Sequence, residues 1–442
     1  MHFSIPDTQE LKDETGSTYT SFNIHINGVF HCSVRYSALH QFHEQLKKEF
    51  GGLSMPPFPP KKFLSLTPAK VDERRQMLER FIQIISQDPQ ISNSDTFNGF
   101  FLKAQQETQK EPSEAVSLDV YLMNGHKITV KIMSTDQTED VLEAVASQIE
   151  LPDEFVYYFG LFLVQKEEGG DNSIIRKLQE FESPYISLKY ANNVGSHRIV
   201  LRKSIWDLAY EDDLLDNKIA MNLLYVQAVS DIERQWTLGT KEQLRHLATL
   251  QQRGSKREYL RLARTMKYYG YIQFKPCVTD YPHPLSRVFV AAGHRELNFR
   301  IQTDSSTMKE GSFKITRMRC WRITTSMPES NGQIAIGGQS SKPKLELSFE
   351  YLMAKDTLKW ITITTDQAIL MSMCLQSMVD ELIMKKQGKK IKKPQDRSKM
   401  DSRTAQQENG YQPSKAVDEK PKGKNKTFVE NNAFDTIGDD DL

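Results

Sequence analysis

Residues 35–62 read RYSALHQFHEQLKKEFGGLSMPPFPPKK, and this stretch decides the fold of the N-terminal part of the chain. It begins with an arginine and a tyrosine at the end of a strand-like run. It ends with two lysines that follow a proline-rich loop. Between them, residues 37–50 have apolar side chains at helical spacing. The stretch therefore predicts a strand, a helix and a loop, with cationic side chains at both ends.

The surrounding sequence completes a first domain at residues 1–108. Residues 22–26 alternate in polarity, Asn27-Gly28 is a strong hairpin signal, and residues 29–34 give the second strand. A helical pattern begins near Val71, and a third covers residues 94–105. These patterns predict a small sheet with helices packed on it.

The cationic residues of this domain indicate a phosphate site. The guanidinium of Arg35 offers a planar fork that matches phosphate oxygens, and Tyr36 offers a flat face for a ring. Lys61 follows the proline-rich loop, and Arg74 lies near the start of the next helix. Three separated cations around one aromatic face suit a ring that carries several phosphates or hydroxyls. The alternative is that these arginines form surface salt bridges with nearby glutamates.

The bulk composition limits the classes of function. The chain has 442 residues, which predicts about three domains. Its net charge of +1 gives no indication of nucleic-acid binding. The four cysteines are scattered without a CxxC spacing, so we expect buried thiols in a reducing cytosol and no metal site. The longest apolar-rich run, residues 155–164, is half of a membrane span. We therefore expect a cytoplasmic protein that meets membranes only at their cytosolic surface.

Three further blocks and a tail follow. Residues 115–205 begin with a hairpin at Asn124-Gly125, continue with a helix capped by Asp136 or Thr138, and then show strand patterns at residues 157–165, 185–189 and 198–201. This order predicts a ubiquitin-like lobe. Residues 206–270 read as helical.

Residues 271–387 read as short strands closed by a helix at 367–386, which is typical of a pleckstrin-homology or phosphotyrosine-binding (PTB) lobe. We expect the tail, residues 388–442, to be disordered, because it has few large apolar residues.

The first block resembles the phox-homology (PX) domain, a reader of phosphoinositides, through its Arg-Tyr-Ser triplet and Pro-Pro-x-Pro-x-Lys loop. The resemblance implies that Arg35 holds the 3-phosphate and Tyr36 stacks on the inositol ring, with Ser37 beside them. Lys61 would contact the 1-phosphate and Arg74 the 4- and 5-hydroxyls. The implied ligand is phosphatidylinositol 3-phosphate on the early endosome.

The next three blocks, in their order, resemble a FERM module. A FERM module directly after a PX domain resembles a small sorting-nexin subfamily, and the segments 1–6, 134–141, 313–322 and 374–382 carry that likeness. In this subfamily the third lobe binds Asn-Pro-x-Tyr or Asn-x-x-Tyr signals in receptor tails, such as those of the LDL-receptor family or integrins, by strand addition. The resemblance would put Trp321 and Val379 beside the peptide. From the residues alone, both are more typical of a core.

The last twelve residues, NNAFDTIGDDDL, combine spaced apolar residues with acidic ones. They are similar to the tail by which this subfamily engages the Retriever/CCC-type retrieval complex. The residues implied in that contact are Phe434, Ile437, Asp440, Asp441 and Leu442. Residues 385–399 form a basic run. The stretch between this run and the end motif is short and lacks the long Ser- and Arg-rich segment expected in the subfamily.

The leading hypothesis is therefore a monomeric cargo adaptor that is not an enzyme and needs no cofactor. The alternative is a FERM-type membrane–cytoskeleton linker or signalling scaffold. Nucleotide-binding, zinc-protease and serine-hydrolase motifs do not occur. Two interpretations stay open for Phe63, Leu64 and Leu66, which either insert into a membrane or pack the proline-rich loop.

Overall fold

The computed structural model describes residues 1–51, 55–62, 66–166, 172–193, 195–302, 308–326, 344–391 and 426–430. These residues form two compact units. The first contains residues 1–121 and 127–201, and the second contains residues 122–126, 202–391 and 426–430. Both units combine helices with sheets, which confirms the mixed architecture predicted from the sequence.

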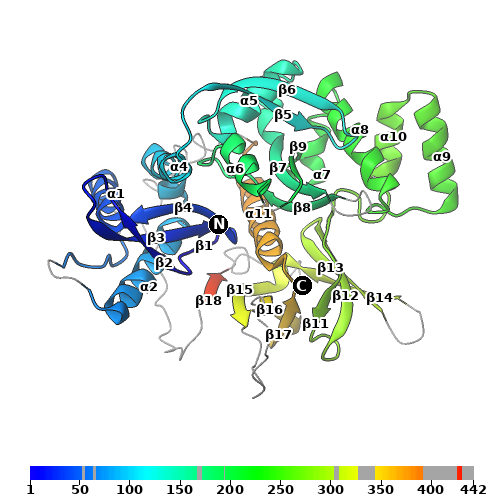
Figure 1. The fold of residues 1–442 in the computed structure, drawn as a ribbon. Coiled ribbons are helices and arrows are strands. Elements are labelled where there is room, and N and C mark those ends of the chain that lie inside the picture. Colours follow the sequence, from blue (N-terminus) through cyan, green and yellow to red (C-terminus); the bar gives the residue numbers. More distant parts are fainter. Residues whose placement is uncertain are drawn as a thin grey trace, which may run out of the picture. The chain divides into compact units, whose positions relative to one another are not determined.

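An antiparallel sheet opens the first unit (Figure 1). Its strands are β1 (Phe3–Ser4), β2 (Thr8–Lys12), β3 (Thr18–Ile26) and β4 (Val29–Arg35). β4 pairs along β3, and β1 and β2 pair with the two ends of β3. The predicted hairpin is confirmed, because Asn27 and Gly28 have φ values of 52° and 78°, as a two-residue turn requires.

Four helices pack against this sheet: α1 (Tyr36–Glu49), α2 (Pro68–Ile85), α3 (Pro89–Ser92) and α4 (Asp95–Gln109). Their apolar faces share one core with the strands. α2 begins at Pro68, before the predicted start at Val71, because a proline suits the first helical position whereas the apolar pattern starts later.

The rest of the first unit has the predicted ubiquitin-like arrangement. Its sheet has the order β6-β5-β9-β7-β8, with β5 and β9 parallel. The strands are β5 (Ala115–Tyr121), β6 (Lys127–Met133), β7 (Phe159–Lys166), β8 (Asn172–Lys177) and β9 (His197–Lys203). The helices are α5 (Thr138–Gln148), the 3-10 helix η1 (Asp153–Tyr158) and α6 (Pro184–Ala191).

Two local predictions in this lobe were wrong. Residues 185–189 form part of helix α6 rather than a strand, because Ser183 caps the helix by accepting a hydrogen bond from the Ile186 N–H and Pro184 occupies its first position. α5 has Gln137 as its N-cap, in a capping box with Asp140, rather than Asp136 or Thr138.

A buried polar contact joins α4 to the segment before α6. The amide of Gln105 accepts a hydrogen bond from the Ser183 N–H at 2.8 Å and donates one to Ser187 Oγ at 3.0 Å. Ser187 in turn donates to Glu182, which forms a buried ion pair with Arg176. Burial alone would raise the pKa of Glu182, but the Arg176 guanidinium outweighs it and lowers the pKa. The contact is therefore satisfied on both sides.

The second unit contains a helical lobe and a sheet lobe. The helices are α7 (Leu208–Asp212), α8 (Lys218–Glu233), α9 (Lys241–Gln252) and α10 (Lys256–Ala263). The sheet lobe follows the predicted outline of strands closed by one helix, α11 (Ala368–Lys386). Its remaining elements are β10 (Ile272–Gln273), β11 (Cys277–Thr279), β12 (Ser286–Gly293), β13 (Glu296–Gln302), β14 (Met308–Lys314), the 3-10 helix η2 (Ile315–Arg317), β15 (Met318–Ser326), β16 (Lys344–Ala354), β17 (Thr357–Thr364) and β18 (Lys426–Glu430).

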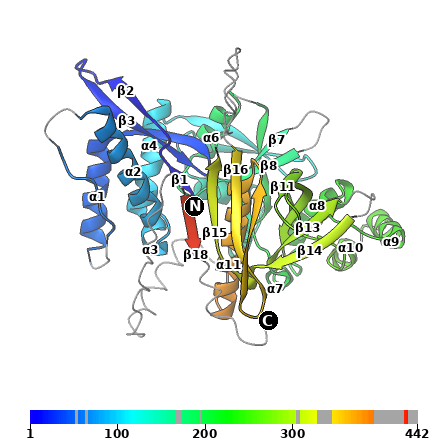
Figure 2. The ribbon, with the colours of Figure 1, turned by 90° about the horizontal axis from the view of Figure 1, so that it is seen from below.

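The sheet has the order β14-β13-β12-β11-β17-β16-β15-β18, and α11 runs across β15 and β16 (Figure 2). β18 comes from the segment expected to be a disordered tail. It pairs antiparallel with β15, from Cys320 opposite Glu430 to Thr324 opposite Lys426. Part of the tail therefore forms an edge strand of the sheet lobe.

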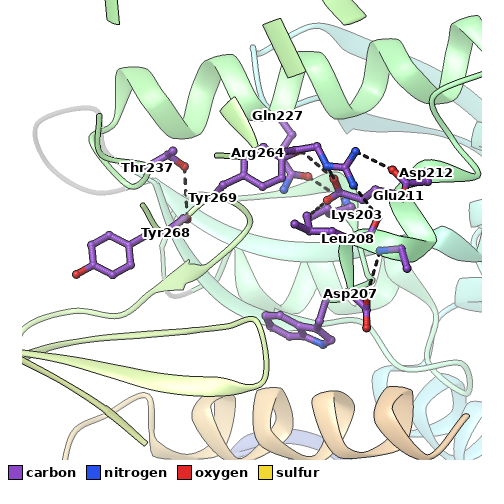
Figure 3. A network of polar contacts seen from close by, with 12 residues as sticks. Lys203, Asp207, Leu208, Glu211, Asp212, Gln227, Thr237, Arg264, Tyr268 and Tyr269 are labelled. Carbon is purple, nitrogen blue, oxygen red and sulfur yellow. Dashed lines mark hydrogen bonds and ion pairs between the residues drawn. The ribbon is translucent and has the colours of Figure 1, made fainter. Parts of the chain in front are cut away.

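A buried carboxylate connects α7 to β9 and to the end of α10 (Figure 3). Glu211, on α7, is ion-paired with Lys203 and lies 3.5 Å from Arg264 Nε. Tyr269 Oη donates a hydrogen bond to it at 3.1 Å. Burial is the largest cause that raises the pKa of Tyr269. Because Glu211 is fully partnered, its charge is tolerated inside the protein.

Asp207, just before α7, links the two lobes of this unit. Its carboxylate accepts a hydrogen bond from Lys385 Nζ at 2.6 Å and is ion-paired with Arg295. Burial would raise the pKa of Asp207, but the bonds from Lys385, the Ala209 N–H and Arg295 outweigh it and hold the pKa at about 2.

Replacement of this carboxylate should lower the stability of the second unit. Asp207→Asn is expected to cost about 1–2 kcal/mol of unfolding free energy at pH 7, since two cations lose a partly exposed anionic partner. The folded pKa lies below the ordinary value of 3.8, so the stabilisation is present above that value and is lost as pH falls towards about 2. Urea unfolding from pH 7 downwards measures it.

Asp356→Asn, in the exposed turn between β16 and β17, is the matched control and should leave stability unchanged. A difference between Asp207→Asn and the parent protein that stays constant from neutral to acidic pH would contradict this assignment.

Candidate functional site

The beginning of α1 is an open helix terminus. Arg35 is the N-cap residue, with extended φ and ψ of −76° and 152°, and its side chain caps no N–H group. The first turn contains no acidic residue. The N–H groups of this turn and the positive end of the helix dipole are therefore available to an anion.

The aromatic ring of Tyr36 is held between the helix and the proline-rich loop. The guanidinium of Arg74, on α2, lies 4.1 Å from the ring centroid. Tyr36 Oη donates a hydrogen bond to the Pro59 carbonyl at 2.7 Å, and Arg74 donates one to the Pro60 carbonyl at 3.1 Å. Burial is the main cause that raises the pKa of Tyr36. The structure thus brings together Tyr36 and Arg74, two of the residues predicted to bind the lipid.

The other predicted residues of this site are exposed. Ser37 lies in the first turn of α1, and Lys61 directly follows the loop carbonyls that bind Tyr36 and Arg74. The guanidinium of Arg35 lies 4.6 Å from the ring centroid of Tyr19. Both side chains line a groove of about 770 Å³ between α1 and α4. Two interpretations were left for Phe63, Leu64 and Leu66, namely membrane insertion or packing of the proline-rich loop. Phe63 and Leu64 lie outside the described residues, and Leu66 is half-buried.

The sequence did not single out Tyr19 or Phe58. Tyr19 lies in a polar stretch, where nothing marks it as the partner of Arg35. Phe58, between two pairs of prolines, packs its ring 4.5 Å from that of His43 and 5.0 Å from that of Phe81. The proline-rich loop is therefore fixed to the domain core by its phenylalanine.

The second candidate site is the edge of the sheet lobe at β15. Trp321 is completely buried, and its indole N–H donates a hydrogen bond to Ser372 Oγ on α11 at 2.9 Å. Val379, further along α11, is also buried. Both side chains lie in the core beneath the sheet. At this edge the main-chain N–H and C=O groups of β15 can pair with a further strand, and β18 occupies that position.

The residues predicted to bind a retrieval complex, Phe434 to Leu442, lie outside the described residues. Within the described part of the chain, no helix is long and apolar enough to cross a bilayer. Nor do three or more side chains of the metal-ligating types gather there. All four cysteines are free and buried, as expected.

Family models match most of the chain. The model described as "PX domain" matches residues 22–104. Those described as "Sortin nexin 17/27/31, FERM domain, F1 lobe" and "Sortin nexin 17/31, FERM domain, F2 lobe" match residues 116–206 and 207–267. The model "Sorting Nexin 17 FERM C-terminal domain" matches residues 270–383. Binding modules, rather than catalytic domains, thus account for these ranges.

Several curated proteins are similar over nearly the full chain. Sorting nexin-17 of Danio rerio is 56% identical over 403 residues, which cover 90% of this chain and 85% of the relative. Sorting nexin-17 of Homo sapiens is 54% identical over 395 residues, covering 89% and 84%. Sorting nexin-31 of Homo sapiens is 37% identical over 388 residues, covering 87% and 86%. The chain therefore belongs to the sorting nexin-17 family, in which a PX domain precedes the three lobes of a FERM module.

Proposed function

We propose that this chain, an endosomal sorting adaptor with a phosphoinositide-binding domain, binds phosphatidylinositol 3-phosphate at the beginning of α1. The observation that carries the proposal is the stack of Arg74 on Tyr36, held by two carbonyls of the proline-rich loop. One face of a flat, rigid ring is thereby set beside the open terminus of α1. The inositol ring would lie against Tyr36, with its phosphates at the helix terminus.

Each cationic side chain has a role in this proposal. Arg35 would leave its contact with Tyr19 and take the 3-phosphate as a bidentate ligand together with N–H groups of the first turn of α1. Ser37 lies in that turn. Lys61 would contact the 1-phosphate, which connects the headgroup to the membrane. Arg74 would donate to the 4- and 5-hydroxyls. A ligand of this kind would place the protein on the cytosolic face of early endosomes.

We further propose that the sheet lobe recognises Asn-Pro-x-Tyr or Asn-x-x-Tyr signals in the cytoplasmic tails of receptors, for example of the LDL-receptor or integrin type. The support is that β15 lies at a sheet edge that accepts a further strand. The buried Trp321 and Val379 would act by fixing β15 and α11 in place, rather than by touching the peptide.

The pairing of β18 with β15 bears directly on this proposal. A receptor peptide that adds to the same edge must displace residues 426–430. Because β18 belongs to the same chain, its effective concentration at the edge is high, on the order of millimolar for two linked sites. The affinity of the adaptor for a peptide is therefore set by competition with its own tail.

The C-terminal residues Phe434, Ile437, Asp440, Asp441 and Leu442 are proposed to bind a Retriever/CCC-type retrieval complex, which would return the receptor to the cell surface. The order of apolar and acidic residues supports this. A membrane–cytoskeleton linker is the second candidate function, but no observation on the described residues favours it.

Loss of the Arg35 side chain should weaken lipid binding strongly. Arg35→Ala is expected to bind vesicles containing phosphatidylinositol 3-phosphate about 10- to 100-fold more weakly, because a charge-assisted pair of hydrogen bonds is lost. Vesicle flotation with a panel of phosphoinositides measures the change. Arg80→Ala, an exposed arginine on α2, is the control. Equal binding by Arg35→Ala and Arg80→Ala would refute the assigned site.

Removal of β18 should strengthen peptide binding. A chain that ends at Asn425 is expected to bind a fluorescent Asn-Pro-x-Tyr peptide more tightly than the full chain, since nothing competes for β15. A chain that ends at Glu430 keeps β18 and is the matched control. Fluorescence anisotropy gives both dissociation constants. Absence of peptide binding in every form would overturn the proposed recognition. Equal affinities of the chains ending at Asn425 and at Glu430 would show that β18 does not compete with the peptide.

The last residue should matter for retrieval alone. Deletion of Leu442 is expected to leave vesicle flotation and peptide affinity unchanged but to stop receptor recycling in cells, because an apolar anchor of the end motif is lost. A surface-biotinylation assay follows the receptor. Normal recycling after this deletion would show that the end motif has no part in retrieval.

A further inference from the structure

The α9–α10 hairpin of the helical lobe is strongly basic. Residues 241–267 contain eight Lys or Arg and two Glu, a net charge of +6, whereas the whole chain has a net charge of +1. Figures 1 and 2 both show α9 as the outermost helix of this lobe. A concentration of charge on one outer hairpin needs a physical explanation.

Many of these cations already have partners. Arg257 pairs with Asp216 at 2.8 Å, Arg261 with Glu258 at 2.6 Å and Arg264 with Asp212 at 2.8 Å. Lys267 pairs with Glu310. In contrast, Lys241, Arg245 and Arg253 form no ion pair with any carboxylate of the described residues. The unpaired charge is thus concentrated on α9.

The free cations of α9 share one helix face with an exposed leucine. Lys241, Leu244, Arg245 and Ala248 follow the spacing that places side chains on the same face, and all four are exposed. Leu244 is 41% exposed, while Leu247 and Leu250 on the opposite face are buried. Leu238, in the loop before the helix, is 37% exposed. An apolar side chain is therefore presented between two cations.

This face is rigid. Thr240 and Gln243 form a reciprocal capping box, in which Gln243 Oε1 accepts from the Thr240 N–H at 2.9 Å and Thr240 Oγ1 accepts from the Gln243 N–H at 3.2 Å. A capped first turn does not fray. The backbone positions of Lys241 and Leu244, both in or next to this turn, are consequently set before any ligand arrives.

We propose that the exposed face of α9, formed by Lys241, Leu244, Arg245 and Ala248, docks on an anionic lipid surface as a membrane contact separate from the PX site. Each Lys or Arg close to an anionic leaflet is attracted to it, and Leu244 adds exposed apolar surface beside these cations. The cations attract anionic headgroups, and Leu244 enters the apolar region beneath them. This contact recognises surface charge and no particular headgroup.

An acidic protein segment is the other occupant with complementary charge. A specific protein interface buries about 800 Å² on each partner, usually in a packed patch. Two turns of one convex helix with a single exposed leucine offer much less area than that. A lipid surface makes no such demand, because each side chain enters it independently. The exposed face of α9 therefore fits a membrane better than a peptide.

Charge reversal on this face should abolish binding to anionic vesicles that lack phosphoinositide. Each cation near an anionic leaflet contributes about fivefold to the partition coefficient, so Lys241→Glu with Arg245→Glu is expected to lower it roughly 25-fold or more. The full chain is floated with phosphatidylserine-rich vesicles at low and at high salt. The control is Lys131→Glu with Lys218→Glu, two exposed cations elsewhere. A thermal melt confirms that each variant is folded.

A second pair of variants tests the apolar contact. Leu244→Ala should weaken binding several-fold, whereas Met133→Ala, with a side chain that is 38% exposed, should not. Arg35→Ala should retain its binding to these vesicles, which separates this contact from the PX site. Unchanged flotation of the α9 charge-reversal variant would overturn the proposal. The acidic peptide of residues 431–442 is the probe for protein docking. The proposal is also overturned if the parent protein binds this peptide and the charge-reversal variant loses the peptide but still binds vesicles, since α9 would then be a protein-docking surface.

Discussion

One carboxylate near the end of α11 connects the sheet lobe to the segment that leads into the helical lobe. Glu381 accepts hydrogen bonds from the Trp206 and Asp207 N–H groups at 2.9 and 2.6 Å. The same helix supplies Ser372 to the indole of Trp321 and Ser377 to that of Trp206. α11 thus supports β15 from below and holds the helical lobe at its end. The proposed peptide edge and the start of the helical lobe therefore contact the same helix.

This arrangement explains why buried residues matter to recognition without touching a ligand. The course of β15 depends on the packing of its inward side chains, and Trp321 is the largest of them. Close packing holds the Trp321 ring in one orientation, and its hydrogen bond to Ser372 satisfies the buried indole N–H. The binding property of the edge therefore originates in the core.

Much of the fold could be predicted because its signals are local. The Asn27-Gly28 turn, the periodicity of α1 and the alternation in β16 each lie within a few residues. Residues 185–189 were misassigned because their apolar spacing is ambiguous over so short a run, and the competing signal was the cap at Ser183 with Pro184. The candidate phosphate site followed from the types and order of its residues. In contrast, the contact of Arg35 with Tyr19 and the pairing of β18 with β15 depend on distant segments.

The first unit has a consequence for the way its PX domain can be handled. Phe181, from the segment before α6, belongs to the core of the N-terminal domain and packs its ring 5.6 Å from that of Phe101 and 6.1 Å from that of Phe3. A fragment that ends directly after α4 lacks this ring, so a cavity remains where the ring packed, and the amide of Gln105 loses its partners Ser183 and Ser187. The PX domain therefore shares its core with a segment of the following lobe. Exchanging it between relatives requires the segment around residues 181–187 to be transferred with it.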